Sequence, residues 1–520
     1  MISIPNERLT IKLLRRGIFL EQLAELQNES DIRGIAITTK EYQANLTTEI
    51  VQKIAIGIIN WLRQSGVKGK LTVGVGRDSR LSGQKLQRGL IEELTTYGVD
   101  VYDFGLATTP ALFMSTQFSQ FSCDAGIMLT ASHLPYYYNG VKVFSQKGGA
   151  EKEDITYILS HSDKSQLNEE KGQVTEADLL TVYAKDLVEK IRAANPKKGD
   201  SPLSDFKIIV DAGNGSGGFF TEKVLQALGA DTSGSQFLTP DGNFPNHIPN
   251  PDNKEAMQSI QKAVLSEKAD LGVIFDTDVD RSAVVTKSGD VLNRNNLIAV
   301  LSRIVLAEHP GTSIVTNSPT SDHLKTFIES LGGYQVRYIS GYRNVINKAL
   351  DLNQKGVDTQ LAIETSGHAA FKENYFLDDG AYVIAKILML LPNLQEEGKT
   401  LESLIADLKQ PLETQEVRFK LEADNYRTLG QRVIQQIANI DITGWEIDPE
   451  NEEGIRFRLT PPYGHGWFLL RMSLHEPLLV LQVENDEAGY IIPVLKKIQQ
   501  FLANYPDVNQ EKLTALLSNE

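Results

Sequence analysis

Four short stretches of the sequence carry side chains that could take part in chemistry. The first is TASH, residues 130–133, in which Ser132 follows the apolar run AGIML. Open α/β sheets bind ligands in loops at the carboxyl ends of their strands, so Ser132 lies where a ligand could bind, with a solvated serine in a turn as the alternative. A hydrolase dyad of Ser132 and His133 is not expected, because neighbouring residues of an extended chain point in opposite directions and no G-x-S-x-G motif surrounds the serine.

The second stretch, FDTDVDR, has acidic side chains at every second position: Asp276, Asp278 and Asp280. In an extended segment this spacing places three carboxylates on one side, which suits a hard cation such as Mg²⁺. Three aspartates packed together without a cation would repel one another. The spacing therefore predicts a metal site, with a solvated polar turn as the alternative.

The third and fourth stretches contain groups that bind sugars and phosphates. Glu364 and Ser366, in IETSGH, can hydrogen-bond the vicinal hydroxyls of a sugar, although a helix cap explains the pair about as well. Arg471, Ser473 and His475 lie on a predicted turn between two strands, where a guanidinium and hydroxyl groups can hold a phosphate. A surface hairpin with a salt bridge is the alternative for this turn.

The elements that must position these loops follow an α/β pattern. Apolar runs such as 70–76 and 125–131 alternate with helical periodicity such as 82–98, which favours parallel strands covered by helices. The same pattern returns further along the chain, at residues 206–230, 269–281, 311–333 and 359–371. We therefore expect an α/β protein with three similar mixed-sheet α/β domains.

A chain of 520 residues is too long for one hydrophobic core. Changes of composition and pattern mark boundaries near residues 196, 289 and 410. The predicted domains are 1–195 with the serine loop, 196–288 with the metal loop, 289–410 with the sugar loop and 411–520 with the phosphate loop. The last is expected to be a smaller α+β domain, because several predicted strands follow one another before a closing helix at 487–504.

Composition excludes several classes of function. The 67 acidic and 52 basic residues give a net charge of −15, which disfavours binding to nucleic acid or to an anionic membrane. No apolar run approaches the roughly 20 residues that span a bilayer, and residues 1–27 suit an amphipathic helix better than a signal peptide. The single cysteine, Cys123, is expected to be a structural thiol in a reducing compartment. We therefore expect a cytoplasmic protein.

A competing motif lies between a predicted strand and a predicted helix. Gly213, Gly215 and Gly218 match G-x-G-x-x-G, with Asp231 further on, which is typical of dinucleotide-binding oxidoreductases. In that fold the acidic residue should close the second strand, whereas Asp231 precedes TSGSQFL. The motif is less specific than the four loops taken together.

In this order and spacing, the four loops resemble the α-D-phosphohexomutase superfamily. Its signatures are a TASHNP serine loop, a DGDGDR metal loop, an ExSGH sugar loop and an RxSNTEP-like phosphate loop. The similarity covers nearly the whole chain and extends to SDIRG (30–34), GRDSRLSG (76–83), GLATTPAL (105–112), PDGNFPNHIPNP (240–251) and LDDGAY (377–382). The resemblance implies four domains around a central cleft that binds hexose phosphates and hexose bisphosphates, in a monomer or small homo-oligomer.

The resemblance also implies a role for each loop. Ser132 would be a phosphoserine that gives its phosphoryl group to a hexose phosphate and takes one back. Mg²⁺, held by this group and the three aspartates, would offset the roughly −1.5 to −2 charges that a phosphoserine adds and stabilise the transition state. The resemblance further implies that Arg33 and Lys142 polarise the reacting hydroxyl and that His368 transfers a proton. Glu364 and Ser366 would bind the sugar, and the Arg471 loop would hold the second phosphate. The remaining residues of the cleft would be Arg281, Tyr342 and Arg343.

Several positions depart from the family pattern. Leu134 replaces the usual Asn, Thr277 and Val279 replace glycines, Arg343 stands where Lys is common, and Leu474, His475 and Val480 alter the phosphate loop. A mutase must keep its bisphosphate intermediate while it reorients, so an altered clamp favours release. TASHLPY is similar to a branch that makes glucose 1,6-bisphosphate from a phosphohexose and a donor such as fructose 1,6-bisphosphate. The alternatives are an ordinary phosphoglucomutase or phosphomannomutase and a catalytically silent sugar-phosphate sensor.

Overall fold

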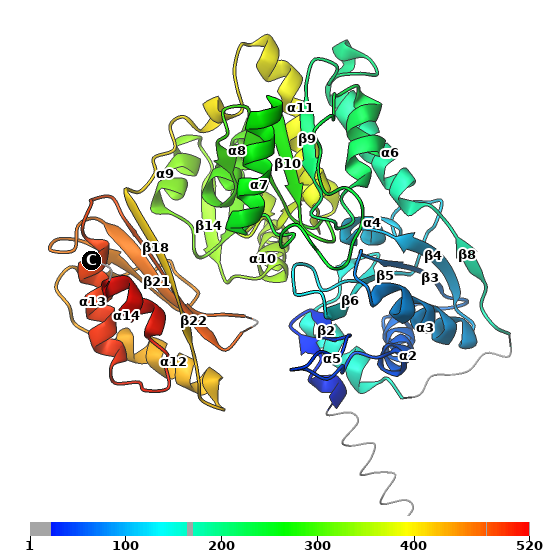
Figure 1. Cartoon of the computed structure of the whole chain (residues 1–520), viewed down its shortest axis with the longest axis horizontal. Coiled ribbons are helices and arrows are strands. Elements are labelled where there is room, and N and C mark those ends of the chain that lie inside the picture. Colours follow the sequence, from blue (N-terminus) through cyan, green and yellow to red (C-terminus); the bar gives the residue numbers. More distant parts are fainter. Residues whose placement is uncertain (1–21, 164–169, 475, 519–520) are drawn as a thin grey trace, which may run out of the picture. The chain divides into compact units, whose positions relative to one another are not determined.

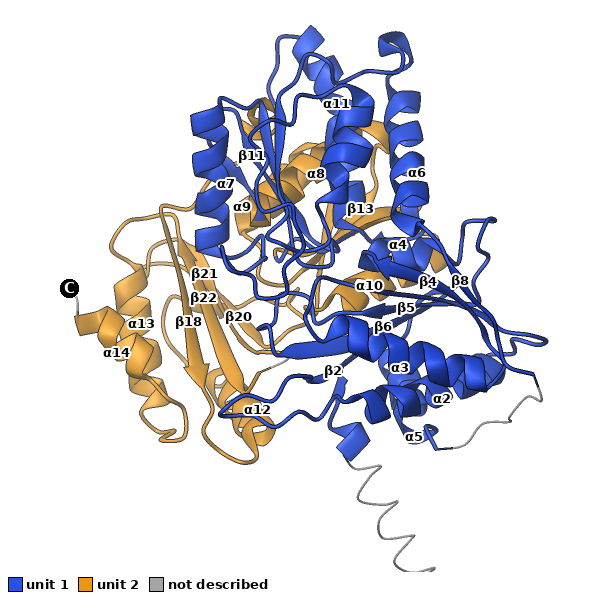
Figure 2. Ribbon diagram, turned by 45° about the vertical axis from the view of Figure 1, so that its right-hand side comes forward, with its two compact units in different colours: residues 1–293, 366–369, 374–400 blue, residues 294–365, 370–373, 401–520 orange. Residues whose placement is uncertain are grey.

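A computed structural model describes residues 22–163, 170–474 and 476–518 (Figure 1). It divides into two units (Figure 2). Unit 1 comprises residues 1–293, 366–369 and 374–400, and unit 2 comprises residues 294–365, 370–373 and 401–520. Most of the amphipathic helix predicted for residues 1–27 lies outside the described residues.

The first sheet of unit 1 carries the serine loop. Its order is β1-β2-β6-β5-β3-β4-β8, with β7 paired to β6. The central strands β3, β4 and β5 are parallel, whereas β6 is antiparallel to both β5 and β2. The strands are β1 (Gln27–Asn28), β2 (Asp31–Ile35), β3 (Thr72–Arg77), β4 (Asp100–Leu106), β5 (Ala125–Leu129), β6 (Tyr138–Ser145), β7 (Gly148–Gly149) and β8 (Val174–Glu176). The predicted parallel layer is thus mixed at one side.

Helices of this part pack through stripes of apolar side chains. They are α2 (Thr48–Gln64), α3 (Gly83–Thr96), α4 (Thr109–Met114), α5 (Lys152–Ser160) and α6 (Leu179–Ala194). In α2 the buried residues Val51, Ile54 and Ile58 recur at helical spacing and join one hydrophobic cluster with strands β3 and β5. Cys123 is also buried, and burial raises the pKa of its thiol to about 12, which fits a structural thiol.

The second sheet of unit 1 carries the metal loop between β10 and β11. Its order is β12-β11-β10-β9, parallel between β9 and β10 and antiparallel elsewhere. Helix α7 covers it through Met257, Ile260 and Val264. The elements are β9 (Ile208–Asp211), β10 (Leu271–Phe275), β11 (Ser282–Thr286), β12 (Val291–Leu292) and α7 (Lys254–Glu267). Unit 1 also contains α11 (Gly380–Glu396) and β17 (Leu377–Asp378), a strand that is not part of this sheet.

The helix expected at the end of the α/β segment 206–230 is not a regular α-helix in the structure. A π-helical turn, Thr221–Leu225, is followed by a 3₁₀ turn, Gln226–Leu228. Gly229 then adopts φ +90° and stops the helix, as glycine does at a helix end. At the other side, a Cβ on Gly218 would lie 2.4 Å from the carbonyl oxygen of Leu238, so the chain packs too closely there for any other residue.

Unit 2 begins with a parallel layer. Strand β13 pairs in parallel with β14 and β15. The elements are α8 (Arg294–Glu308), β13 (Ser313–Asn317), α9 (Asp322–Ser330), β14 (Tyr334–Tyr338), α10 (Tyr342–Gln354) and β15 (Thr359–Ile363), while β16 (Ala369–Phe371) lies where the chain crosses between the two units. The start of α10, at Tyr342, follows Gly341, whose φ is +117°.

The C-terminal part of unit 2 is an antiparallel sheet of order β18-β22-β21-β20-β19, with helices packed on it. Phe457 and Phe468 stack in its core at a centroid distance of 4.9 Å. The elements are β18 (Glu413–Lys420), α12 (Tyr426–Ile437), β19 (Trp445–Ile447), β20 (Ile455–Leu459), β21 (Gly466–Met472), β22 (Leu478–Asn485), α13 (Ile491–Leu502) and α14 (Glu511–Ser518). The predicted closing helix corresponds to α13, and α14 was not predicted.

The predicted fold class is confirmed: three α/β sheets and a smaller C-terminal α+β part are present. The boundaries predicted near residues 196, 289 and 410 stay predictions. Within residues 22–163, 170–474 and 476–518, no helix has the length and apolar character that a membrane span requires.

Candidate active site

Ser132 lies in the loop between β5 and β6, and its hydroxyl meets the metal loop. Its Oγ is 2.9 Å from Oδ2 of Asp276 and 3.1 Å from Nη2 of Arg281. The residue is only 3% exposed, and its φ of +49° lies in the left-handed region that non-glycine residues rarely adopt. Two loops that are far apart in the sequence therefore converge on one strained, buried hydroxyl, a combination typical of functional sites.

His133 corrects one sequence-based expectation. The Oγ of Ser132 is 3.4 Å from Nδ1 of His133, because the positive φ of Ser132 removes the extended geometry that would point the two side chains apart. Arg281 donates from Nη2 to the same Nδ1, at 2.7 Å. Burial and the nearby guanidiniums lower the pKa of His133 well below its usual value, so the ring is neutral and Nδ1 accepts. That nitrogen is engaged by Arg281, which still argues against a Ser–His dyad.

The three aspartates of the metal loop are buried together. Single carboxylate oxygens of Asp276, Asp278 and Asp280 all lie within 4.8 Å of one another. Burial raises the pKa of Asp276 well above its usual value, and the charges of Asp280 and Asp278 raise it further. Oδ1 of Asp278 and Oδ1 of Asp280 have no hydrogen-bond partner among the described residues. Crowded, buried carboxylates with unpartnered oxygens are a donor set that fits Mg²⁺.

One departure from the family pattern lies at a strained position of the metal loop. Val279, which stands where the resemblance predicts glycine, has φ +68°, a region that β-branched residues avoid. Its carbonyl accepts a hydrogen bond from the backbone N–H of Gly380, at 3.0 Å. The loop therefore keeps the backbone shape expected of a glycine, at the expense of local strain.

Two cations compensate the acidic cluster. Lys142, 3% exposed, pairs with Oδ2 of Asp280 and lies 3.4 Å from Oδ2 of Asp278. Nη2 of Arg281 is 3.3 Å from Oδ2 of Asp276. Burial alone would raise the pKa of Asp280, but Lys142, His368 and Arg281 outweigh it and hold that pKa below its usual value, so Asp280 is ionised.

Arg33 lies on the strand beside Lys142. Residue 33 pairs with Gly140 across β2 and β6, and Gly140 and Lys142 are two positions apart on β6. Side chains two residues apart on a strand share a face, so Arg33 and Lys142 lie on the same face of the sheet. Nη2 of Arg33 donates to Oδ2 of Asp31, at 3.0 Å.

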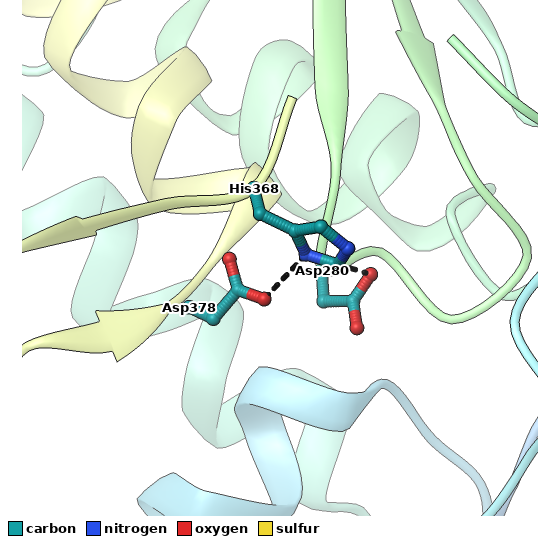
Figure 3. A group of neighbouring side chains, drawn as sticks. All are labelled: Asp280, His368 and Asp378. Atoms are coloured by element: carbon teal, nitrogen blue, oxygen red, sulfur yellow. Dashed lines mark hydrogen bonds and ion pairs between the residues drawn. The ribbon is translucent and has the colours of Figure 1, made fainter. Parts of the chain in front are cut away.

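His368 lies between two carboxylates, as Figure 3 shows. Its Nδ1 is 2.5 Å from Oδ2 of Asp378 and 3.9 Å from Oδ1 of Asp280. Burial would lower the pKa of His368, but the charges of Asp378 and Asp280 outweigh it and raise that pKa. Asp378 also accepts the backbone N–H of Ala369, at 3.0 Å, which fixes the carboxylate. Asp378 belongs to the LDDGAY motif, but nothing in the sequence indicated that it orients the histidine.

Arg80 and Asp78, in the GRDSRLSG motif, were also missed as site residues. Arg80 is 1% exposed and donates four hydrogen bonds to carbonyl oxygens of the serine loop. Nη2 binds the carbonyls of Ser132 (2.5 Å) and Leu134 (2.6 Å), and Nη1 binds those of Pro135 (2.8 Å) and Tyr138 (3.0 Å). Nε of Arg80 is 3.2 Å from Oδ2 of Asp78. Burial raises the pKa of Asp78 to about 6, despite the opposing charge of Arg80.

The glycine motif of residues 213–218 supports the metal loop. A Cβ on Gly215 would lie 2.6 Å from the carbonyl oxygen of Thr277, and the backbone N–H of Ser216 donates to that oxygen at 2.8 Å. On the other side, the N–H of Thr109 donates to the carbonyl of Asp278 at 2.9 Å. Close packing against the metal loop thus accounts for Gly215 without a dinucleotide.

Of the remaining predicted binding residues, Glu364, Tyr342 and Arg343 belong to unit 2. Oε1 of Glu364 accepts the N–H of Gly341 at 2.7 Å. Tyr342 and Arg343 open α10, where Nη2 of Arg343 donates to Oδ1 of Asn347 at 3.2 Å. Ser366 belongs to unit 1, and its buried Oγ has no hydrogen-bond partner within the described parts of the chain.

The predicted phosphate loop is the turn between β21 and β22. The N–H of Ser473 donates to the carbonyl of Leu478 at 2.9 Å, and Oγ of Ser473 accepts the N–H of Glu476 at 3.3 Å. Arg471 is at the end of β21, with Nη1 3.3 Å from the carbonyl of Met472. His475 lies outside the described residues.

Comparison with known proteins decides the family. Models of α/β/α domains I, II and III of phosphoglucomutase/phosphomannomutase match residues 24–169, 181–289 and 293–412. The chain belongs to this family. It is an enzyme of the α-D-phosphohexomutase superfamily, as the four loops predicted.

Relatives match over nearly the whole length of this phosphohexomutase chain. A phosphomannomutase/phosphoglucomutase of Pseudomonas aeruginosa is 32% identical over 457 residues, covering 88% of this chain and 90% of the relative. A phosphoglucomutase of Neisseria gonorrhoeae is 30% identical and covers 92% and 96%. A crystal structure of a phosphoglucomutase/phosphomannomutase family protein of Burkholderia thailandensis superposes with a TM-score of 0.76 at 27% identity, covering 94% and 99%.

Proposed function

We propose that the enzyme transfers phosphoryl groups between Ser132 and hexose phosphates, and that it makes glucose 1,6-bisphosphate from a phosphohexose and a donor such as fructose 1,6-bisphosphate. The observation that carries the first part is the position of the Ser132 hydroxyl against Asp276 and Arg281. The names of the relatives support action on glucose and mannose phosphates. An ordinary phosphoglucomutase or phosphomannomutase is the second candidate, and the same names favour it.

The transfer step breaks the bond between phosphorus and Oγ of phospho-Ser132 and forms a bond between phosphorus and a sugar hydroxyl oxygen. Arg281, whose Nη2 is 3.1 Å from Oγ, would hold the phosphoryl oxygens by charge-assisted hydrogen bonds. Oxygens of Asp276, Asp278 and Asp280 would hold Mg²⁺, which supplies charge neutralisation when bound. The sugar hydroxyl must lose its proton as the new bond forms, and Oγ of Ser132 must gain a proton as its bond to phosphorus breaks.

His368 and Lys142 are the proposed proton-transfer and polarising groups. Nδ1–H of His368 donates a hydrogen bond to Oδ2 of Asp378, which keeps a proton on that nitrogen and fixes the orientation of the ring. Lys142, paired with Asp280, would polarise the attacking or leaving hydroxyl together with Arg33. In this account Glu364 and Ser366 hold sugar hydroxyls, Tyr342 and Arg343 line the binding site, and Arg471, Ser473 and His475 hold the phosphate that is not reacting.

Release of the bisphosphate is supported by the phosphate loop. Cδ1 of Leu474 lies 3.2 Å from the place of a Cβ on Gly341, so an apolar side chain is packed where the family pattern has a polar one. Fewer donors to the distal phosphate would shorten the time that the bisphosphate stays bound.

The test is to incubate the enzyme and Mg²⁺ with glucose 1-phosphate, with and without fructose 1,6-bisphosphate, and to follow all phosphate esters by ³¹P NMR. Free glucose 1,6-bisphosphate should accumulate with the donor. Rapid conversion of glucose 1-phosphate to glucose 6-phosphate with almost no free bisphosphate would support the ordinary mutase. Binding of sugar phosphates without any turnover would indicate a catalytically silent sensor.

The other proposals concern the setting of the reaction. We place the enzyme in the cytoplasm, as a monomer or small homo-oligomer. Its partners are hexose phosphates and hexose bisphosphates rather than nucleic acid or membrane, in keeping with its net charge of −15.

A further inference from the structure

Glu453 lies between the predicted phosphate loop and the segment that leads into α10. It occupies the turn before β20, and its Oε2 accepts a hydrogen bond from the hydroxyl of Ser340, at 2.7 Å. Its Oε1 is 3.7 Å from Nη1 of Arg471. The side chain of Glu453 is 8% exposed and that of Arg471 is 19% exposed. A buried carboxylate therefore already neighbours the guanidinium that is proposed to receive a phosphate.

The backbone holds Glu453 at this place. Gly454 has φ +57°, and a Cβ there would lie 2.3 Å from the carbonyl oxygen of Leu470 and 2.8 Å from Cα of Arg471. Only glycine allows the turn to approach β21 so closely. The carbonyl of Glu453 accepts a hydrogen bond from Nδ2 of Asn451, at 2.7 Å. The turn is therefore built to bring Glu453 beside Arg471.

The partner of Glu453 connects the phosphate loop to the sugar-binding residue of unit 2. Ser340 precedes Gly341, whose N–H donates to Glu364. A line of contacts thus runs from Arg471 through Glu453 and Ser340 to the Glu364 loop. Because the hydroxyl of Ser340 holds Oε2, the carboxylate is restrained from turning away when an anion approaches Arg471.

We infer that Glu453 is a specificity-determining residue that competes with the distal phosphate of a bound sugar bisphosphate for Arg471. The inference rests on the proposed function, in which Arg471 binds that phosphate. A phosphate that reaches Arg471 must approach a restrained carboxylate of like charge, which opposes binding. Glu453 thereby weakens the grip on glucose 1,6-bisphosphate and favours its release over a second transfer.

The test measures binding without turnover. Full-length Ser132→Ala protein, which cannot exchange a phosphoryl group through that hydroxyl, is titrated with glucose 1,6-bisphosphate and Mg²⁺ by isothermal calorimetry. Adding Glu453→Gln should lower the dissociation constant by roughly three- to tenfold, the scale of one modest electrostatic contact. Glu453→Asp keeps the charge on a shorter side chain, so its dissociation constant should lie between those of the parent and of Glu453→Gln.

Glu452→Gln is the matched control. It removes the same charge from the neighbouring position, where the half-exposed Glu452 is 3.6 Å from Nζ of Lys348 instead of near Arg471. It should change the dissociation constant less than twofold. Thermal unfolding of each variant checks that the fold is kept, and Glu453→Asp serves if Glu453→Gln does not fold.

Two outcomes would overturn the inference. If Glu453→Gln and Glu453→Asp bind the bisphosphate as weakly as the parent or more weakly, Glu453 does not compete with it. If Glu452→Gln tightens binding as much as Glu453→Gln, the effect is one of overall charge. Neither outcome depends on turnover, so failure here is distinct from failure of the proposed synthase activity, which the ³¹P experiment on the wild-type enzyme detects.

Discussion

The serine–metal centre of unit 1 and the phosphate loop of unit 2 are built on opposite principles. Around Ser132, the carboxylates of the metal loop and the cations Lys142 and Arg281 are almost completely buried and paired with one another. In the phosphate loop, Arg471 is partly exposed, and its neighbour at position 474 is apolar. In the proposed function, the buried and paired centre carries out the transfer, and the more exposed phosphate loop determines whether the bisphosphate is released.

The largest loss of phosphoryl transfer is expected when the proposed nucleophile is removed. Ser132→Ala should lower phosphoryl transfer by at least about three orders of magnitude, because covalent transfer through Oγ becomes impossible. Transfer is measured by ³¹P NMR with fructose 1,6-bisphosphate and glucose 1-phosphate. Ser119→Ala, at an exposed serine of the same domain, should leave the rate unchanged. Normal turnover by Ser132→Ala would contradict covalent catalysis.

Removal of a metal-loop carboxylate should come next in size. Asp278→Asn keeps the shape of the side chain but removes one charge from the proposed Mg²⁺ site, and should lower the rate by roughly a hundredfold or more. EDTA should abolish the wild-type rate, and added Mg²⁺ should restore it. Circular dichroism should show an unchanged fold. An EDTA-insensitive wild-type rate would show that the aspartates do not serve a metal.

Arg80 tests whether the serine loop must be held rigidly. Arg80→Lys keeps the charge but cannot bind four carbonyls at once, so the loop should move and kcat should fall by about ten- to a hundredfold, with a smaller change in KM. The free energy of unfolding should fall by about 1 to 3 kcal/mol, because buried carbonyls lose donors. Arg88→Lys, at an exposed site on α3, is the control. An unaltered kcat together with lowered stability would reduce Arg80 to a structural role.

The smallest expected effect concerns pH and the buried Asp379, which caps α11 by accepting the N–H of Tyr382 at 2.9 Å. Burial raises the pKa of Asp379 to about 6, so the folded state binds its proton more tightly than the unfolded state. Its contribution to stability is therefore complete below about pH 4 and is lost as pH rises through about 6.

Relative to Asp379→Asn, the wild type should lose about 2 kcal/mol of unfolding free energy between pH 4 and pH 7. Urea unfolding at several pH values measures it, with the exposed Asp424→Asn as control. A difference between wild type and Asp379→Asn that does not change with pH would show that Asp379 has an ordinary pKa.

The sequence predicted the site loops better than the residues that hold those loops in place. Ser132 and the three aspartates each follow an apolar strand, and ligands bind at such strand ends, so the apolar pattern was enough to find both loops. The two loops belong to different sheets, so this pattern alone did not show that they meet. Arg80 could not be found in this way, because its partners are backbone carbonyls, which any sequence supplies. Glu453 was missed because it belongs to no motif, and Asp378 was missed because the LDDGAY pattern does not show its contact with His368.

The backbone conformation at Ser132 also overturned one prediction made from the sequence. The expectation that Ser132 and His133 point apart assumed an extended chain, and the left-handed φ of Ser132 removes that assumption. Val279 shows the reverse case, in which a residue that disfavours a positive φ adopts one because the surrounding loop contacts fix it. Such strained positions are not readable from residue type alone.

The most direct test of the account is the state of Ser132 after one exposure to donor. Purified enzyme is stripped of phosphate, incubated with Mg²⁺ and fructose 1,6-bisphosphate, and analysed by intact mass and peptide mapping before glucose 1-phosphate is added. We expect one phosphoryl group on Ser132, which then disappears as free glucose 1,6-bisphosphate appears in equal amount. An unmodified Ser132, or a phosphoryl group that stays on it when the sugar phosphate is added, would contradict the account.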